Sequence, residues 1–207
     1  MTTYRFICAV AVTAGLVFSG SAAWALPNSG HSEHLLMDDV THIGAATLTV
    51  TSPAFADGAR IPYENTQYRG NTFPGLKWTQ GPTKTQSYVV IFQGMETEGQ
   101  HAGGTVIALT VFNVPATVTA LDTGMTTPPA GAVLGPNVRG LNKPYAGPHV
   151  KGTEAHRYFV QVFALDTALP PDPQTTYERL SAQMAGHVVA VGVLKATSDK
   201  DPESKEN

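Results

Sequence analysis

Short runs of polar and apolar residues in the chain follow the two-residue period of β-strands. Residues 47–51 alternate strictly between threonine and a larger aliphatic side chain, as expected of a strand with one buried face. Four further runs are rich in β-branched and aromatic residues: 88–92, 106–112, 158–165 and 188–194. Glycine and proline pairs such as Gly81-Pro82 separate the runs. The pattern predicts a mostly β fold of the sandwich type.

A single helix is predicted near the C-terminus. Thr175 and Glu178 have the spacing of a capping box. Leu180 and Met184 then recur on one helical face, and Gly186 is expected to end the helix. We expect this helix to pack on one end of the sandwich.

The first 25 residues have the three parts of a secretory signal peptide. Arg5 supplies a positive charge, residues 6–18 form an apolar run, and Ala23 and Ala25 are small residues at the cleavage site. A transmembrane anchor is the rival interpretation, but a run of about 13 residues is shorter than the roughly 20 that span a bilayer. We therefore expect cleavage after Ala25, export to a periplasm or to the outside of the cell, and no integral membrane span afterwards.

The exported part is predicted to be one domain with a polar segment at each end. Residues 26–45 contain three histidines and show no sustained periodicity, which predicts an N-terminal arm. Residues 46–197 form the predicted β-sandwich domain, and the charged residues 198–207 a disordered tail. The only cysteine, Cys8, lies in the signal peptide, so the exported domain is expected to rely on core packing instead of disulfides.

Composition and net charge indicate which classes of binding partner are not expected. Of the 207 residues, 42% are hydrophobic and 14% are charged, which is the balance of a globular chain. The formal net charge of -3 gives no electrostatic reason to expect a nucleic acid or an anionic membrane surface as the partner. The oligomeric state stays open.

Five motifs follow one another along the domain: residues 48–55 (LTVTSPAF), 70–78 (GNTFPGLKW), 113–115 (NVP), 152–159 (GTEAHRYF) and 184–190 (MAGHVVA). In this order they resemble the phosphatidylethanolamine-binding protein (PEBP) family, in its bacterial Raf-kinase-inhibitor-like branch. The resemblance covers residues 48–196. It implies a Greek-key β-sandwich with a small cavity that accepts phosphate or a phospholipid head group, and members of the family also inhibit kinases or proteases.

The resemblance also implies which residues build the cavity, and the chain departs from the family at several of them. Gly94 and Glu96 occupy the positions of two aspartates, and Ala108 occupies that of a strand histidine. The candidate ligand-binding residues that remain are His156, Glu96, Tyr158, Gly147, Pro148 and His149. For His156, a buried structural role is an equal alternative.

A histidine kept protonated by a carboxylate would give a phosphate charge-assisted hydrogen bonds. The leading hypothesis is therefore an exported, non-enzymatic protein that binds a small anionic ligand or a phospholipid head group weakly near His156 and Glu96. The alternative is a vestigial pocket on a protein that binds or inhibits another exported protein through its surface loops. If the cavity is otherwise intact, changing Gly94 to aspartate and Ala108 to histidine should raise the affinity for phosphate.

Catalysis and metal binding have little support in the sequence. It contains no G-x-S-x-G, H-E-x-x-H or phosphate-binding G-x-x-x-x-G-K-[ST] motif. A catalytic triad with His156 and Asp166 would lack a visible nucleophile. His31 and His34 are spaced to share a metal but have no third ligand, so neither a metal nor a cofactor is predicted. His187 is expected to cap or pack at the end of the helix.

Overall fold

The computed structural model describes residues 35–40, 42–95 and 104–204. The predicted signal peptide and most of the predicted arm lie outside the described residues. Within the described residues, no helix is long and apolar enough to cross a membrane.

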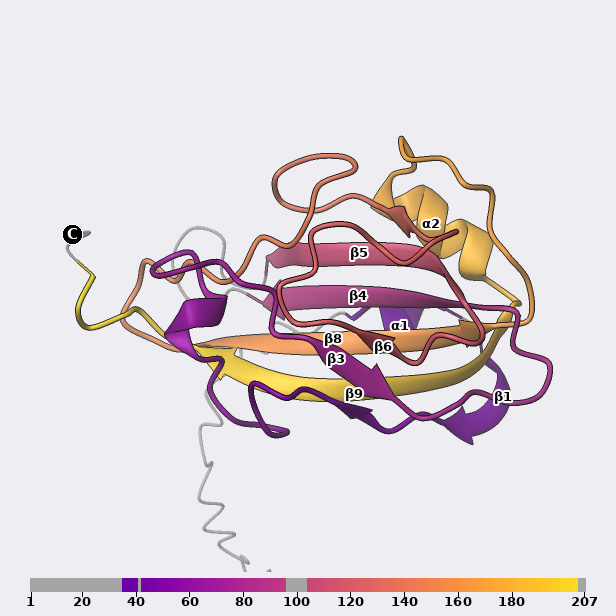
Figure 1. Cartoon of the computed structure of the whole chain (residues 1–207), viewed down its shortest axis with the longest axis horizontal. Coiled ribbons are helices and arrows are strands. Elements are labelled where there is room, and N and C mark those ends of the chain that lie inside the picture. The colour runs from indigo at the N-terminus through magenta and orange to yellow at the C-terminus, as the bar shows by residue number, and fades with distance from the viewer. Residues whose placement is uncertain (1–34, 41, 96–103, 205–207) are drawn as a thin grey trace, which may run out of the picture. The chain divides into compact units, whose positions relative to one another are not determined.

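Two β-sheets form the framework of the domain (Figure 1). The larger has the order β1-β9-β8-β4-β5-β7, and the smaller the order β2-β3-β6. The strands of the larger sheet are β1 (His42–Thr47), β4 (Ser87–Met95), β5 (Thr105–Pro115), β7 (Val133–Leu134), β8 (His156–Leu165) and β9 (Val188–Ser198). The smaller sheet has β2 (Val50–Thr51), β3 (Leu76–Trp78) and β6 (Ala120–Leu121). The helices are α1 (Leu36–Asp39), the 3-10 turn η1 (Tyr63–Asn65) and α2 (Tyr177–Met184).

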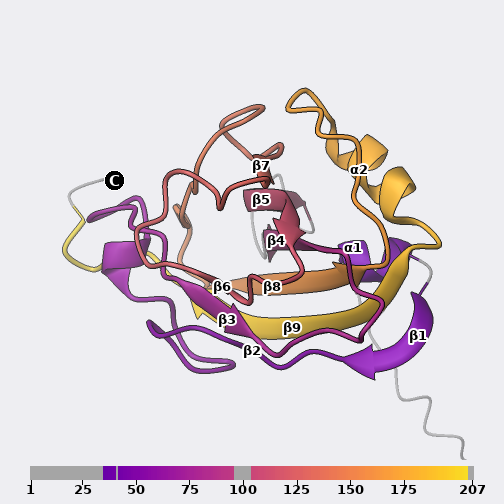
Figure 2. The same ribbon diagram turned by 45° about the vertical axis from the view of Figure 1, so that its right-hand side comes forward.

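The large sheet is covered on both faces, which explains why its central strands are apolar throughout. Figure 1 shows β3 and β6 in front of it, and Figure 2 shows α2 on the side away from β2 and β3. Side chains of the small sheet, such as Trp78, pack in one core with Val90 and Phe92 of β4. On the opposite face Leu180 and Met184 of α2 pack on neighbouring positions of the large sheet. All nine residues of β4 are therefore buried, as in a strand that has no solvent-facing side.

The prediction of a mostly β sandwich is confirmed, and four of the five predicted runs form β4, β5, β8 and β9. The fifth run, residues 47–51, is divided between the two sheets. β1 ends at Thr47 and pairs in parallel with β9, whereas β2 pairs with β3 of the small sheet. Leu48 and Val50 are buried and Thr49 is exposed. The predicted alternation of buried and exposed side chains is therefore present, although the chain passes from one sheet to the other within this run.

The large sheet begins before the predicted domain boundary at Ala46. Residues His42–Thr47 form its edge strand, so part of the predicted arm belongs to the sheet. This segment is a strand because it pairs with the edge of β9. Its own sequence has no alternation of polar and apolar residues that would have predicted a strand.

The predicted helix is present, but it begins one residue later than the capping box indicated. Thr176 is the N-cap, and its side-chain oxygen accepts a hydrogen bond from the backbone N–H of Arg179 at 3.2 Å. A backbone hydrogen bond and one from Thr176 lower the pKa of Glu178 in the first turn. Thr175 is fully buried instead. Gly186 follows the helix with a φ of 77°, the left-handed conformation that ends helices.

Candidate functional site

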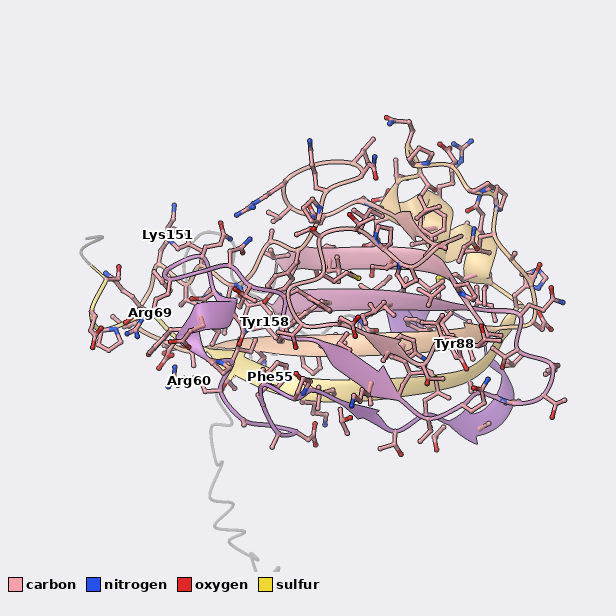
Figure 3. The ribbon with its side chains drawn as sticks, viewed as in Figure 1. Phe55, Arg60, Arg69, Tyr88, Lys151 and Tyr158 are labelled. Carbon is pink, nitrogen blue, oxygen red and sulfur yellow. The ribbon has the colours of Figure 1, made fainter. Side chains whose placement is uncertain are left out.

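A cavity of about 200 Å³ opens at the end of the large sheet where β8 begins. Its lining comes from β5, β8 and two loops: Gln67, Val106, Ala108, Val138, Ala146, Gly147, Pro148, His149 and Tyr158. Figure 3 places Tyr158 toward this end of the sheet, with Arg69 and Lys151 beyond it, and Tyr88 at the opposite end. Four of the six predicted ligand-binding residues therefore line one cavity, namely Gly147, Pro148, His149 and Tyr158.

The floor of the cavity is made by neighbouring strands. Gly94 of β4 lies between Val106 of β5 and Tyr158 of β8 in the strand register. The register of β4 and β5 shifts by one residue beside Phe92, which leaves Ala108 as the additional residue of a bulge. The carbonyl of Ala108 accepts a hydrogen bond from the backbone N–H of Ala146 at 2.8 Å. This bond fixes the loop wall to the floor.

The Gly147-Pro148 wall is held by the loop that follows η1. The Gly147 N–H donates to Oδ1 of Asn71 at 2.7 Å, and Nε2 of Gln67 donates to the Gly147 carbonyl at 2.6 Å. The Gln67 N–H donates to the Pro148 carbonyl at 3.0 Å. Asn71 has a φ of 51°, which asparagine tolerates better than most residues. Two loops distant in sequence are therefore bonded into a single wall.

Arg139 places a positive charge beside the mouth of the cavity. Its Nη2 donates to Oε1 of the lining residue Gln67 at 3.0 Å. The tight turn that carries it is closed by reciprocal backbone bonds between Asn137 and Gly140, each 2.9 Å long. Among the described lining residues there is no carboxylate that would neutralise this charge. The sequence offered no signal for Arg139, because only the tertiary fold brings residues 67 and 139 together.

Packing requires a glycine at position 94. A Cβ atom at this position would lie 2.4 Å from Cε1 of Tyr158 and 3.0 Å from two other ring carbons. The phenol ring therefore lies against the backbone of Gly94, where a side chain would project. Because of this overlap, we expect Gly94→Asp together with Ala108→His to rebuild an anion site only if the ring of Tyr158 moves.

His156 does not line the cavity. It precedes Tyr158 by two positions on the same face of β8. In the strand register it lies opposite Ser198 of the neighbouring strand β9. Its side chain is 9% exposed, and its Nε2 atom is buried with no hydrogen-bond partner in the described part of the chain. This position agrees with the alternative of a buried structural role. Glu96, the sixth predicted residue, lies outside the described residues.

The triad considered from the sequence is excluded by geometry. His156 begins β8 and Asp166 follows its last residue, so about 30 Å of extended strand separates them. Oδ1 of Asp166 instead lies 2.9 Å from Nδ1 of His187. His187 thus pairs at the end of α2 that is remote from the cavity.

The C-terminal residues differ from the predicted disordered tail. Ser198 is still part of β9, and the side chain of Asp201 is 3% exposed. Asp201 accepts hydrogen bonds from Nε and Nη2 of Arg69 at 2.6 and 3.2 Å, and Glu203 pairs with the same guanidinium at 2.9 Å. Because Arg69 belongs to the loop that carries Gln67, these ion pairs anchor the loop that forms part of the cavity wall.

This anchor predicts a pH dependence of stability. The hydrogen bond from Arg69 lowers the pKa of Asp201, so its contribution is complete above the unfolded-state pKa near 3.9 and is lost as pH falls through the folded-state pKa. The difference in unfolding free energy between the wild type and Asp201→Asn should therefore be constant above about pH 5 and shrink below about pH 4. Urea unfolding across pH measures it. Asp172→Asn, at the exposed pair with Arg179, is the control, and an equal acid-limb change there would contradict the assignment.

The chain resembles known proteins over most of its length. Residues 51–199 match the family model described as phosphatidylethanolamine-binding protein. A UPF0098 protein of Chlamydia pneumoniae is 33% identical over 155 residues, covering 74% of this chain and 99% of that protein. A UPF0098 protein of Methanothermobacter thermautotrophicus is 31% identical over 151 residues, covering 71% and 95%.

Two solved structures share the fold. The crystal structure of a PEBP homologue from Chlamydia trachomatis has a TM-score of 0.67 and 28% identity, covering 76% of this chain and 100% of that one. The crystal structure of Escherichia coli YbcL, described as a member of the mammalian PEBP family, has a TM-score of 0.66 and 26% identity, with 75% and 100% coverage. The chain therefore belongs to the phosphatidylethanolamine-binding protein family.

Proposed function

We propose that the protein is an exported, non-enzymatic binding protein that holds a small anionic ligand or a phospholipid head group at the mouth of this cavity. The observation that carries the proposal is the Arg139 guanidinium, bonded to the lining residue Gln67. A guanidinium offers five N–H donors, of which this bond uses one. The anion is therefore bound near Arg139, Gln67 and His149 and not near His156.

Burial separates the residues that reach the anion from those that do not. Gln67 and Arg139 are exposed and His149 is half-buried, with its ring 5.1 Å from that of Tyr68. The buried lining residues, such as Ala108 and Ala146, carry apolar side chains. Cationic and polar nitrogen atoms therefore gather at the entrance, where an anion keeps part of its hydration.

An NMR titration of the mature protein with inorganic phosphate tests the proposal. We expect saturable shifts of the backbone amides of Gly147 and His149. Arg139→Gln should weaken binding about tenfold, which is about 1.4 kcal/mol, because a charge-assisted donor is lost.

Lys143→Gln is the matched control. It removes the same charge from the same loop but leaves the bond between Arg139 and Gln67 in place, so phosphate affinity should change less than about twofold. No saturable shift at Gly147 would refute the binding function. Equal losses of phosphate affinity in Arg139→Gln and Lys143→Gln would show that the affinity depends on net charge and that Arg139 makes no local contact with the anion.

One observation favours the alternative of binding or inhibiting another exported protein. Val138 is 57% exposed and Leu141 is 36% exposed, and they are the exposed large hydrophobic residues of the described chain. Both lie in the loop of Arg139. If the mature protein inhibits a protease or kinase, the double variant Val138→Ser and Leu141→Ser should abolish inhibition under this alternative, whereas Arg139→Gln should not.

Export is part of the proposal and is tested separately. N-terminal sequencing of protein recovered from outside the cytoplasm should begin at Leu26. A chain that still begins at Met1 would contradict cleavage after Ala25.

A further inference from the structure

The lining of the cavity changes from polar to apolar with depth. Val138, Gln67 and His149 at the entrance are exposed or half-buried. Ala108 and Ala146 are each 1% exposed and Tyr158 is 4% exposed. Gly147 and Pro148 are buried as well. The described residues that line the inner part therefore present methyl groups, a proline ring, an aromatic ring and the backbone of residues 147–148, and their side chains carry no charge.

The tyrosine ring seals the inner end. It lies against Gly94 and packs edge-on against Phe92, with ring centroids 6.1 Å apart. Phe92 packs in turn on Tyr145 at 5.6 Å. Burial raises the pKa of Tyr145 well above its usual range, so its phenol stays neutral and donates to the Asn65 carbonyl at 2.8 Å. A rigid aromatic cluster without charge therefore lies behind the floor.

The volume of the cavity exceeds what a phosphate group at the mouth needs. An apolar cavity of about 150 Å³ is enough to hold a benzene molecule, and this cavity measures about 200 Å³. If a bare inorganic anion occupied the mouth, the inner walls would contact water that has few hydrogen-bond partners. Apolar ligand atoms placed there would gain the contacts that such a space lacks.

From these observations we infer that the cavity selects an anion that carries a small apolar or aromatic substituent, such as an aryl or short-chain alkyl phosphate. The anionic group lies at the entrance near Arg139, and the substituent lies against Ala108 and Tyr158, with the half-buried Val106 beside it. This inference rests on the proposed anion binding and adds the class of ligand. Ala108 contributes to this specificity because its small apolar side chain leaves space in the cavity and offers the ligand no hydrogen bond.

Comparison of phenyl phosphate with inorganic phosphate and phosphorylethanolamine tests the inference. Isothermal titration calorimetry at one pH and salt concentration should show phenyl phosphate binding at least about tenfold more tightly than inorganic phosphate, as expected when roughly 60 Å² of apolar surface is buried. Phosphorylethanolamine, whose substituent is charged, should gain no such advantage. Nuclear Overhauser effects should connect the phenyl protons with the methyl groups of Ala108 and Val106.

A near-isosteric substitution checks the role of the apolar wall. Val106→Thr should reduce the preference for phenyl phosphate over phosphate about threefold, because the wall that contacts the phenyl ring becomes polar. Val193→Thr is the matched control, since Val193 is half-buried on the opposite face of the sheet, and it should leave the preference unchanged.

The outcomes separate this inference from the function on which it rests. Equal affinities for phosphate and phenyl phosphate would overturn the inference and leave anion binding intact. Tighter binding of phenyl phosphate without contacts to Ala108 and Val106 would also overturn it. If none of the three ligands binds, the proposed function itself fails.

Discussion

Replacing Gly147 with alanine is expected to destabilise the domain by about 2–3 kcal/mol and to weaken anion binding at least about tenfold. A Cβ atom at Gly147 would lie 2.4 Å from the carbonyl oxygen of Asn65 and 3.1 Å from Cα of Thr66. Both are backbone atoms, so a change of side-chain rotamer cannot relieve the overlap.

The backbone opposite Gly147 is also held in place. The Asn65 carbonyl accepts the phenol hydrogen of Tyr145, and the Thr66 N–H donates to the Tyr63 carbonyl at 3.0 Å. The bulk of the added methyl group must therefore displace the Gly147-Pro148 wall, with loss of its bonds to Asn71 and Gln67.

Urea unfolding and phosphate titration measure the two effects of Gly147→Ala. Gly186→Ala serves as the control, because a Cβ there meets no atom within 4 Å and only the φ of 77° is strained. It should cost about 1 kcal/mol and leave phosphate affinity unchanged. Wild-type affinity in Gly147→Ala would show that this wall does not shape the site.

Gly94→Asp is expected to destabilise the domain by about 3 kcal/mol or more and to lower phosphate affinity instead of raising it. The new Cβ overlaps the ring of Tyr158, and the new carboxylate is placed at a buried position among apolar neighbours. A negative charge near the anion adds repulsion. An acidic residue at position 94 is therefore expected to be harmful while Tyr158 occupies the floor.

A double-mutant cycle isolates the steric cause. Gly94→Ala should cost about 2 kcal/mol in the wild type and less than about 0.5 kcal/mol in a Tyr158→Ala background, where the overlapping ring is absent. Unfolding free energies of the four proteins measure the coupling. Equal costs of Gly94→Ala in both backgrounds would show that the ring is not what excludes a side chain at residue 94.

The strands that could be predicted are those whose burial leaves a local pattern. Residues 88–92 and 158–165 read as strands because both faces of β4 and most of β8 are buried. The edge strand β1 carries no such pattern, since pairing with β9 specifies it. The pairing of Asp201 with Arg69 could not be predicted for a similar reason, because it joins two segments that are distant in sequence.

Some residues of the candidate site could also be predicted from the sequence, and others could not. Resemblance to the family placed Gly147, Pro148, His149 and Tyr158 together, and they line one cavity. It also placed His156 there, but the register of β8 puts that side chain beside Ser198. Arg139 was missed, since no motif relates it to Gln67.

The fold class, the central strands, the C-terminal helix and the family could be predicted from the sequence, because each depends on periodicity or on motifs that follow one another along the chain. The chemistry of the cavity could not be predicted in this way, because it depends on tertiary contacts. The charge of Arg139 reaches the mouth through a contact 72 positions apart in sequence, and Gly94 is required by a ring 64 positions away. Contacts of this kind depend on the position of one strand or loop relative to another, which local sequence patterns do not encode.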